Sequence, residues 1–284
     1  MVRGLLAVAA VIVVVGCAGA GARARAGAEA GAGAREGAGE GAREGAGEEA
    51  GTAEEGEEGE HEGAAEEIEE EAEPAPDAGV KGAPIASRYA AMDRASCEAE
   101  LAKRRIVFER VEEARGVVAP LRLRGTLGGV EIRSMLPAAQ RRTSVYEIYD
   151  CRLVLALDDF ARILNKYEIV EVVHFSVYRP PPARAVANGP GRRHGGALAI
   201  DIGLFKTRDG KTISVEKDFH GRIGGKPCAG TRPKAEPAAT LRKIVCEAAE
   251  AQLFNVMLTP DYNRQHKNHF HFEVAAKSRW VFLR

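Results

Sequence analysis

The chain has no pair of cysteines in the C-x-x-C spacing that is typical of thiolate zinc sites, although it contains five cysteines. Apart from Cys17, four cysteines remain, an even number in a chain that begins with an export-type segment. Disulfides are therefore expected in place of a zinc–thiolate cluster. Three pairings are possible. The sequence favours Cys228 with Cys246, which flank one loop and the helix after it, and Cys97 with Cys151.

The apolar run near the start is too short to cross a bilayer as a stable helix. It covers residues 5–15, follows Arg3 and leads into Gly16 and Cys17. A positive residue followed by a short apolar run is typical of a signal peptide, and small residues before a cysteine resemble the bacterial lipoprotein processing signal. Residues 1–17 are therefore predicted to be a lipoprotein-type signal peptide with Cys17 as the lipidation site. An ordinary secretory signal or an uncleaved anchor is the alternative.

Apolar side chains other than alanine are almost absent from residues 18–78. Glycine, alanine and glutamate dominate, and an eight-residue repeat covers residues 34–41 and again 42–49. The stretch contains 19 acidic and 4 basic residues, so it has little to bury and repels itself. These features exclude a packed core there and predict a disordered acidic tether over residues 18–83.

The remainder of the chain has the opposite charge. Residues 79–284 contain 35 basic and 22 acidic residues, an asymmetry that the overall net charge of −1 conceals. About 200 residues are enough for one buried core, so residues 84–284 are expected to form a single domain. A basic domain suggests an anionic target, although a solvated positive surface explains the charge almost as well. No nucleic-acid partner is expected.

The order of the expected helices and strands predicts an α+β fold with a small, largely antiparallel sheet and flanking helices. Asp158 or Asp159 is expected to cap a helix that runs to Tyr167, and Asp209-Gly210 to turn a hairpin. Further helices are expected over residues 87–105 and from about 237 to 253, and strands over residues 105–111, 117–123, 130–135, 169–178, 254–258 and 269–274. The first three strands are expected to form a small meander or hairpin.

Two histidines one residue apart, His269 and His271, are the most informative pair in the chain. Residues i and i+2 of a strand share one face, so both imidazoles can point into one pocket. The intervening Phe270 and the following Phe272 would then face the core.

His194 and Asp201 form the second part of the candidate site. Their separation of seven residues would place them on opposite faces of a straight strand, so the chain must turn between them. Gly195 and Gly196 permit such a turn. Two imidazoles and one carboxylate are a common zinc ligand set, and a fourth position open to water makes such a site catalytic.

Arg179 follows the strand expected over residues 169–178 and precedes His194. An arginine at this strand end could bind a substrate carboxylate or stabilise an oxyanion. A surface arginine that ends a strand is the equally simple interpretation. Strand alternation places His174, Ser176 and Tyr178 on one face, and Phe175, Val177 and Arg179 on the other.

The other polar candidates carry less information. His174 is expected to be a hydrogen-bonded core residue, His220 to be solvated, and His61 to lie in the tether. Tyr262 and Asn263 are expected either to line a substrate groove or to form a plain turn.

Three runs of sequence together resemble one known family. They are Ser176-Val-Tyr-Arg179, Arg192-Arg-His-Gly-Gly-Ala-Leu-Ala-Ile-Asp201 and Leu258-Thr-Pro-Asp-Tyr-Asn-Arg-Gln-His-Lys-Asn-His-Phe-His271. Over roughly residues 80–274 the chain resembles the bacterial extensin-like C-terminal domain family. That family is similar in turn to the zinc peptidases grouped as lysostaphin-type, D-alanyl-D-alanine metallopeptidase and hedgehog.

The resemblance implies a hedgehog/D-Ala-D-Ala peptidase-like fold and a Zn²⁺ site. In those peptidases the motif S-x-H-x-x-G-x-A-x-D supplies two zinc ligands, and the second histidine of H-x-H supplies the third. Carried over to this sequence, the ligands are His194, Asp201 and His271.

The sequence departs from the motif at two positions that shape the turn: Arg192 stands where serine is usual, and Ala197 where glycine is usual. Asn268 stands where one branch has its glutamate base, so a glutamate base is excluded there. His266 and His269 resemble the histidine-rich arrangement of the murein endopeptidases. One of them would act as general base toward a water whose pKa zinc lowers to about 7.

The resemblance and the export signal together predict an envelope-anchored, zinc-dependent peptidoglycan peptidase, a carboxypeptidase or endopeptidase that acts on stem peptides or cross-links. Its partners would be peptidoglycan and, through the lipid anchor, a membrane. The protein would be exported to the cell envelope and lie, lipid-anchored, in the periplasm or outer membrane or at the cell surface. A catalytically inactive, cell-wall-binding structural lipoprotein is the alternative. A non-haem iron oxygenase fits less well, because its first histidine and carboxylate usually lie two residues apart.

Overall fold

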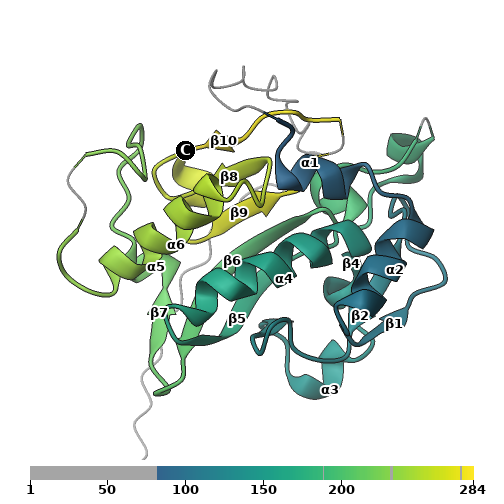
Figure 1. Cartoon of the computed structure of the whole chain (residues 1–284), viewed down its shortest axis with the longest axis horizontal. Coiled ribbons are helices and arrows are strands. Elements are labelled where there is room, and N and C mark those ends of the chain that lie inside the picture. The colour runs from purple at the N-terminus through teal and green to yellow at the C-terminus, as the bar shows by residue number, and fades with distance from the viewer. Residues whose placement is uncertain (1–81, 188, 231–232, 276) are drawn as a thin grey trace, which may run out of the picture. The chain divides into compact units, whose positions relative to one another are not determined.

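The computed structural model describes residues 82–187, 189–230, 233–275 and 277–284. Cys17, His61 and almost all of the expected tether lie outside these residues. Within them the chain folds into helices and two sheets, which confirms the α+β class (Figure 1). No helix of the described part is both long and apolar enough to cross a membrane.

The larger sheet contains seven strands among the described residues, in the order β10-β8-β9-β6-β5-β3, with β7 paired to β6. They are β3 (Glu131–Ser134), β5 (Ile169–Ser176), β6 (Ala199–Thr207), β7 (Thr212–Ser214), β8 (Val256–Leu258), β9 (Phe270–Glu273) and β10 (Phe282–Leu283). The β3–β5 and β8–β10 pairs are parallel and all others are antiparallel, so the expectation of a largely antiparallel sheet is confirmed.

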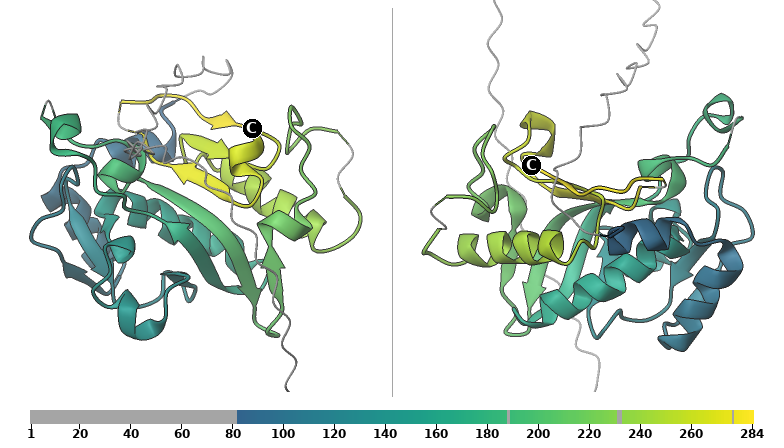
Figure 2. Two further views of the ribbon diagram at one scale, coloured as in Figure 1. Left: turned by 180° about the vertical axis from the view of Figure 1, so that it is seen from behind. Right: turned by 45° about the horizontal axis from the view of Figure 1, so that its top comes forward.

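Helices α4 (Cys151–Asn165) and α6 (Ala238–Glu250) lie together on one face of this sheet (Figures 1 and 2). The fully buried Phe160 of α4 makes edge-on ring contacts with Phe254 and Phe272. Phe270 is fully buried as well, so the expectation that Phe270 and Phe272 face the core is confirmed. Burial of these rings holds β9 against the helices and leaves its other face for polar groups.

The smaller sheet has the order β1-β2-β4, with β1 (Phe108–Arg110), β2 (Pro120–Leu123) and β4 (Tyr149–Asp150). Its first two strands form the expected antiparallel hairpin. The third strand of the expected meander, β3, pairs instead with β5 in parallel, with Ile132 opposite Val172. Local sequence does not specify the partner of a strand, because pairing depends on tertiary contacts.

The helix expected over residues 87–105 is two helices, α1 (Ile85–Ala90) and α2 (Arg94–Lys103). The break occurs because Asp93 adopts an extended conformation and its carboxylate accepts the Ser96 backbone N–H at 2.7 Å. An N-cap inside an apolar periodicity therefore ends one helix and begins the next.

The prediction that Asp158 or Asp159 caps a helix was wrong. Helix α4 begins at Cys151, and Asp150 is its N-cap, accepting the Arg152 backbone N–H at 3.0 Å. Both of the predicted caps lie inside α4 and form ion pairs with Arg104, each at 3.0 Å. An aspartate in a helix interior is tolerated here because the cation of Arg104, the C-cap residue of α2, compensates it.

The remaining elements agree with the sequence expectations more closely. The Asp209-Gly210 hairpin joins β6 to β7. The helix expected from about 237 to 253 appears as α6, and the strands expected over residues 254–258 and 269–274 appear as β8 and β9. Both favoured disulfides are confirmed, Cys97–Cys151 and Cys228–Cys246. Short elements complete the fold: α3 (Ala138–Arg141), α5 (Val215–Asp218), η1 (Val145–Glu147), η2 (Ala183–Val186), η3 (Arg193–Gly196) and η4 (Arg264–His266).

Candidate metal centre

Strands β6 and β9 bring the carboxylate and one histidine of the candidate site together. They pair antiparallel with Asp201 directly opposite His271, and on the other side of β6 Ser176 of β5 is opposite Asp201. Residues opposite each other in an antiparallel pair project to the same face. The sheet register alone therefore places these three side chains side by side.

The turn expected between His194 and Asp201 is present. Residues 193–196 form η3, and the following Ala197 has φ of 52°, in the left-handed region. This is the motif position at which glycine is usual, and alanine adopts that conformation at a cost of about 1 kcal/mol. Gly196 is required for a different reason: a Cβ there would lie 2.1 Å from the backbone oxygen of Gly191.

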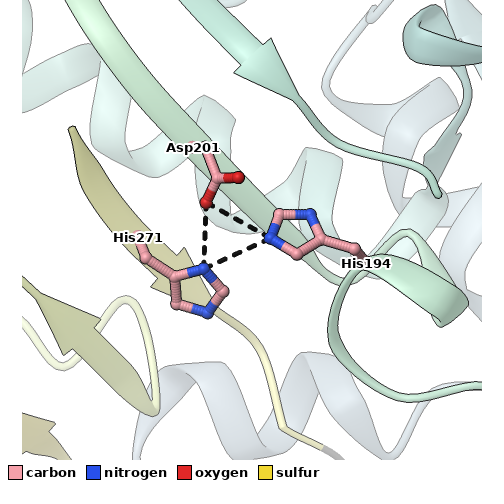
Figure 3. A group of neighbouring side chains, drawn as sticks. All are labelled: His194, Asp201 and His271. Atoms are coloured by element: carbon pink, nitrogen blue, oxygen red, sulfur yellow. Dashed lines mark hydrogen bonds and ion pairs between the residues drawn. The ribbon is translucent and has the colours of Figure 1, made fainter. Parts of the chain in front are cut away.

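Three acceptor-type atoms meet at the centre of the site (Figure 3). The Oδ1 atom of Asp201 lies 3.2 Å from Nε2 of His194 and 3.0 Å from Nδ1 of His271, and the two nitrogens are 3.3 Å apart. Zinc bonds of about 2.0–2.1 Å in a tetrahedron separate the ligand atoms by about 3.3 Å. The three distances therefore match the spacing of a tetrahedral zinc site.

The outer nitrogens of both imidazoles face acceptors. Nδ1 of His194 lies 2.8 Å from the backbone oxygen of Val177, and Nε2 of His271 lies 3.5 Å from a carboxylate oxygen of Glu273. An outer nitrogen that donates its N–H to such an acceptor leaves the inner nitrogen with a lone pair. The inner atoms are then two lone pairs and a carboxylate oxygen, a donor set suited to a cation.

Asp201 is almost fully buried and divides its two oxygens between different partners. Its Oδ2 accepts hydrogen bonds from the Ser176 hydroxyl at 2.9 Å and from the Arg179 guanidinium, while Oδ1 faces the histidines. Burial raises the pKa of Asp201, but the contacts with His194 and His271 outweigh burial and hold the pKa well below its usual range. Asp201 is therefore a carboxylate at any physiological pH.

Arg179 reaches the site, although not by strand alternation. Strand β5 ends at Ser176, so the alternating pattern no longer applies three residues later, and the expectation that Arg179 faces away from Ser176 was wrong. Its guanidinium donates to the Ser176 hydroxyl at 2.8 and 3.1 Å and pairs with Asp201. The side chain is 59% exposed, so it also presents charge to solvent beside the cluster.

His266 and His269 lie next to the cluster. The Nε2 atom of His269 is 3.5 Å from Oδ1 of Asp201, and the ring of His266 is 5.1 Å from that of His269. Burial lowers the pKa of His266 to about 4 and also lowers the pKa of His269. Nδ1 of His266 lies 2.7 Å from the Asn263 amide oxygen, so this side chain supports His266 in addition to its place in a turn.

The other candidate residues contribute no atom to the group formed by His194, Asp201 and His271. His174 is fully buried, and its Nε2 is hydrogen-bonded to the Tyr149 hydroxyl at 2.8 Å, in agreement with a core role. His220 is exposed. The Tyr262 ring contacts His266 and Phe282, with centroids 5.5 and 6.2 Å away.

Two residues of the site received no role in the sequence analysis, namely Ser176 and Glu273. Ser176 joins Arg179 to Asp201, and the buried Glu273 faces His271. The signal for Glu273 was available, because it lies two residues after His271 and therefore on the same face of a strand. The role of Ser176 was indicated by its position at the end of the strand that comes before the turn.

Comparison with protein families gives one result: the model described as "Extensin-like protein C-terminus" matches residues 95–284. The chain matches no curated protein and no solved structure.

Proposed function

This chain belongs to the extensin-like C-terminal family, and we propose that its domain is a zinc-dependent peptidase that acts on peptidoglycan stem peptides or cross-links. The proposal includes a fold of the hedgehog/D-Ala-D-Ala peptidase type. The observation that carries it is the convergence of Asp201 Oδ1, His194 Nε2 and His271 Nδ1 at 3.0–3.3 Å, the spacing of a tetrahedral zinc site with one position left for water.

Zinc, when bound, would polarise a carbonyl and lower the pKa of a water to about 7. The residues around it would supply the rest. His266 and His269 have lowered pKa values, so both are neutral at pH 7 and either can accept a proton there. Arg179 is exposed beside the cluster and can bind a substrate carboxylate or a developing oxyanion with its remaining donors.

The location proposed is the bacterial cell envelope, with Cys17 as the lipid-bearing residue. Two disulfides are consistent with an extracellular protein, because such bonds persist in oxidising compartments. The net positive charge of residues 79–284 suits a carboxylate-rich stem peptide.

Metal analysis tests the ligand assignment. Wild-type protein is expected to contain about one zinc per chain, and His271→Ala and Asp201→Ala are expected to lose most of it. His220→Ala, an exposed histidine outside the cluster, is the matched control and should retain the wild-type content. Near-stoichiometric zinc in both ligand variants would refute the assignment.

Muropeptide analysis tests the activity. Purified sacculi incubated with the zinc-loaded protein are expected to yield shortened stem peptides or resolved cross-links, and the new products identify the bond cut. His266→Ala and His269→Ala are expected to lose activity while retaining zinc. Zinc binding with unchanged sacculi would instead indicate the inactive wall-binding lipoprotein.

A further inference from the structure

A concave surface lies between β2, β3 and α3, of which β2 and α3 are labelled in the lower right part of Figure 1. Its volume is about 330 Å³, within the range of small-ligand sites. No residue of the metal centre lines it. Two glutamates, Glu131 and Glu147, and five arginines do, and the arginines give this arginine pocket its name: Arg122, Arg124, Arg133, Arg141 and Arg142.

The pocket is built by hydrogen bonds from guanidinium groups to backbone oxygens. Arg122 of β2 donates to the backbone oxygens of Thr143 at 3.0 Å and of Ser144. Arg124 donates to that of Arg142 at 3.4 Å. These bonds hold the segment after α3 against β2. A backbone oxygen carries no net charge, so they leave the positive charge of the arginines in place.

Carboxylates compensate only part of this charge. Three of the arginines have a carboxylate partner: Arg124 with Glu109, Arg133 with Glu171 and Arg141 with Glu131. Arg122 and Arg142 have none within the part of the chain that the structure describes. Burial and the neighbouring positive charge of Arg124 lower the pKa of Arg122, and the negative charges of Glu109 and Glu147 offset part of that shift. Arg122 and Arg142 therefore form no ion pair within the described residues, although the carboxylates of Glu131 and Glu147 also line the concave surface.

We propose that the arginine pocket binds an oxyanion, a carboxylate or phosphate group carried by a polyanionic ligand. Guanidinium groups bind both kinds of oxyanion through paired N–H donors, and a concave site strengthens the attraction. Leu123 and Ile132 in the lining supply apolar contacts for the carbon skeleton of such a ligand. The pocket contains no residue of the metal centre, so this binding does not depend on zinc.

Titration calorimetry of the full-length, metal-free protein tests the proposal, with short-chain polyphosphate and oligoglutamate as the two probes. Arg142→Gln is expected to weaken binding of the preferred probe about fivefold, and Arg122→Gln/Arg142→Gln by more than tenfold. Arg142 is exposed and forms no ion pair with any described residue, so its single variant tests the site even where the double variant fails to fold.

The control is Arg88→Gln/Arg208→Gln, which removes the same charge from exposed positions on α1 and after β6. It is expected to change the affinity less than twofold. His271→Ala should bind the probe as the wild type does, which separates this site from the metal centre. Preference for polyphosphate or oligoglutamate identifies the group bound. Equal weakening by the control, or no binding of either probe, would overturn the proposal.

Discussion

At the scale of single residues, the two oxygens of the buried Asp201 carboxylate have different partners. Its Oδ1 faces His194 and His271, and its Oδ2 is occupied by Ser176 and Arg179. Hydrogen bonds on Oδ2 fix the carboxylate plane and so aim Oδ1 at the position between the histidines. Residues that orient a ligand in this way commonly change metal affinity or activity by one to two orders of magnitude.

Ser176→Ala is expected to reduce both zinc affinity and activity about tenfold, because Asp201 and Arg179 lose their shared partner. Ser176→Thr retains a hydroxyl and should recover most of the loss if the backbone admits the added methyl. Chelator competition measures the zinc affinity of both variants. Wild-type affinity in Ser176→Ala would show that the hydroxyl does not orient the ligand.

Arg179→Lys is expected to keep the fold and the zinc while lowering kcat/KM by about tenfold or more. Lysine preserves the charge but loses the planar fork that donates to both Ser176 and a substrate oxyanion. Kinetics on a purified muropeptide substrate, with thermal unfolding as the folding control, provide the measurement. Wild-type kinetics would return Arg179 to the role of a surface residue.

The burial of His174 is expected to make the stability of the fold sensitive to acid. Burial lowers its pKa from 6.5 to about 3, so the unfolded chain binds its proton at a higher pH than the folded chain does. The contribution of neutral, buried His174 to the free energy of unfolding is complete above pH 6.5. It is lost as the pH falls toward 3, at up to about 1.4 kcal/mol per pH unit.

His174→Gln should therefore flatten the slope of unfolding free energy against pH between 6.5 and 4.5 by about one proton, measured by urea unfolding at several pH values. His220→Gln removes an exposed histidine and should keep the wild-type slope. An unchanged slope in His174→Gln would mean that another group titrates in this range.

At the scale of elements, the two disulfides join different kinds of structure. Cys97–Cys151 links α2 to the first residue of α4 inside the core, at a sequence separation of 54. Cys228–Cys246 links a surface loop to α6 across 18 residues. A longer closed loop restricts the unfolded chain more.

Replacing the first pair with alanine is expected to destabilise the domain by about 4 kcal/mol, and replacing the second pair by about 3 kcal/mol. Urea unfolding of Cys97→Ala/Cys151→Ala and Cys228→Ala/Cys246→Ala measures both costs. A larger cost for the second pair would contradict the loop-length argument and would indicate that packing around α6 dominates.

At the scale of the whole molecule, the charge is divided between an acidic N-terminal stretch and a basic remainder. Residues 18–83, almost all outside the described part, have a composition that predicts a random coil with a span of about 45 Å and an extended limit of about 230 Å. If Cys17 carries a lipid, that stretch sets how far the domain reaches from the membrane.

Cys17→Ser is expected to move the protein from the membrane fraction to the soluble fraction. Shortening residues 18–83 to ten residues is expected to reduce wall hydrolysis in cells but not the activity of the purified protein. Fractionation and muropeptide release measure these two effects. A Cys17→Ser protein that stays with the membrane would refute lipidation at this residue.

The sequence by itself identified His194, Asp201 and His271 as candidate ligands, and it predicted the strand that carries His271. His269, His271 and the phenylalanines between and after them follow a period of two, and a period of two is a local property that a strand imposes. The four downstream cysteines likewise indicated their pairing, and the Asp209-Gly210 hairpin followed from the conformational preferences of its own residues.

Only the tertiary structure decided how these pieces meet. The β3–β5 pairing, the contact of Arg179 with Ser176 and the assembly of the arginine pocket each join segments that are separated by a chain turn or by many residues. Asp93 and Asp150 begin helices because their carboxylates accept a backbone N–H, whereas Asp158 lies inside a helix and pairs with Arg104. Such choices are made by packing and by charge compensation across the fold, and the spacing of residues along the chain does not contain them.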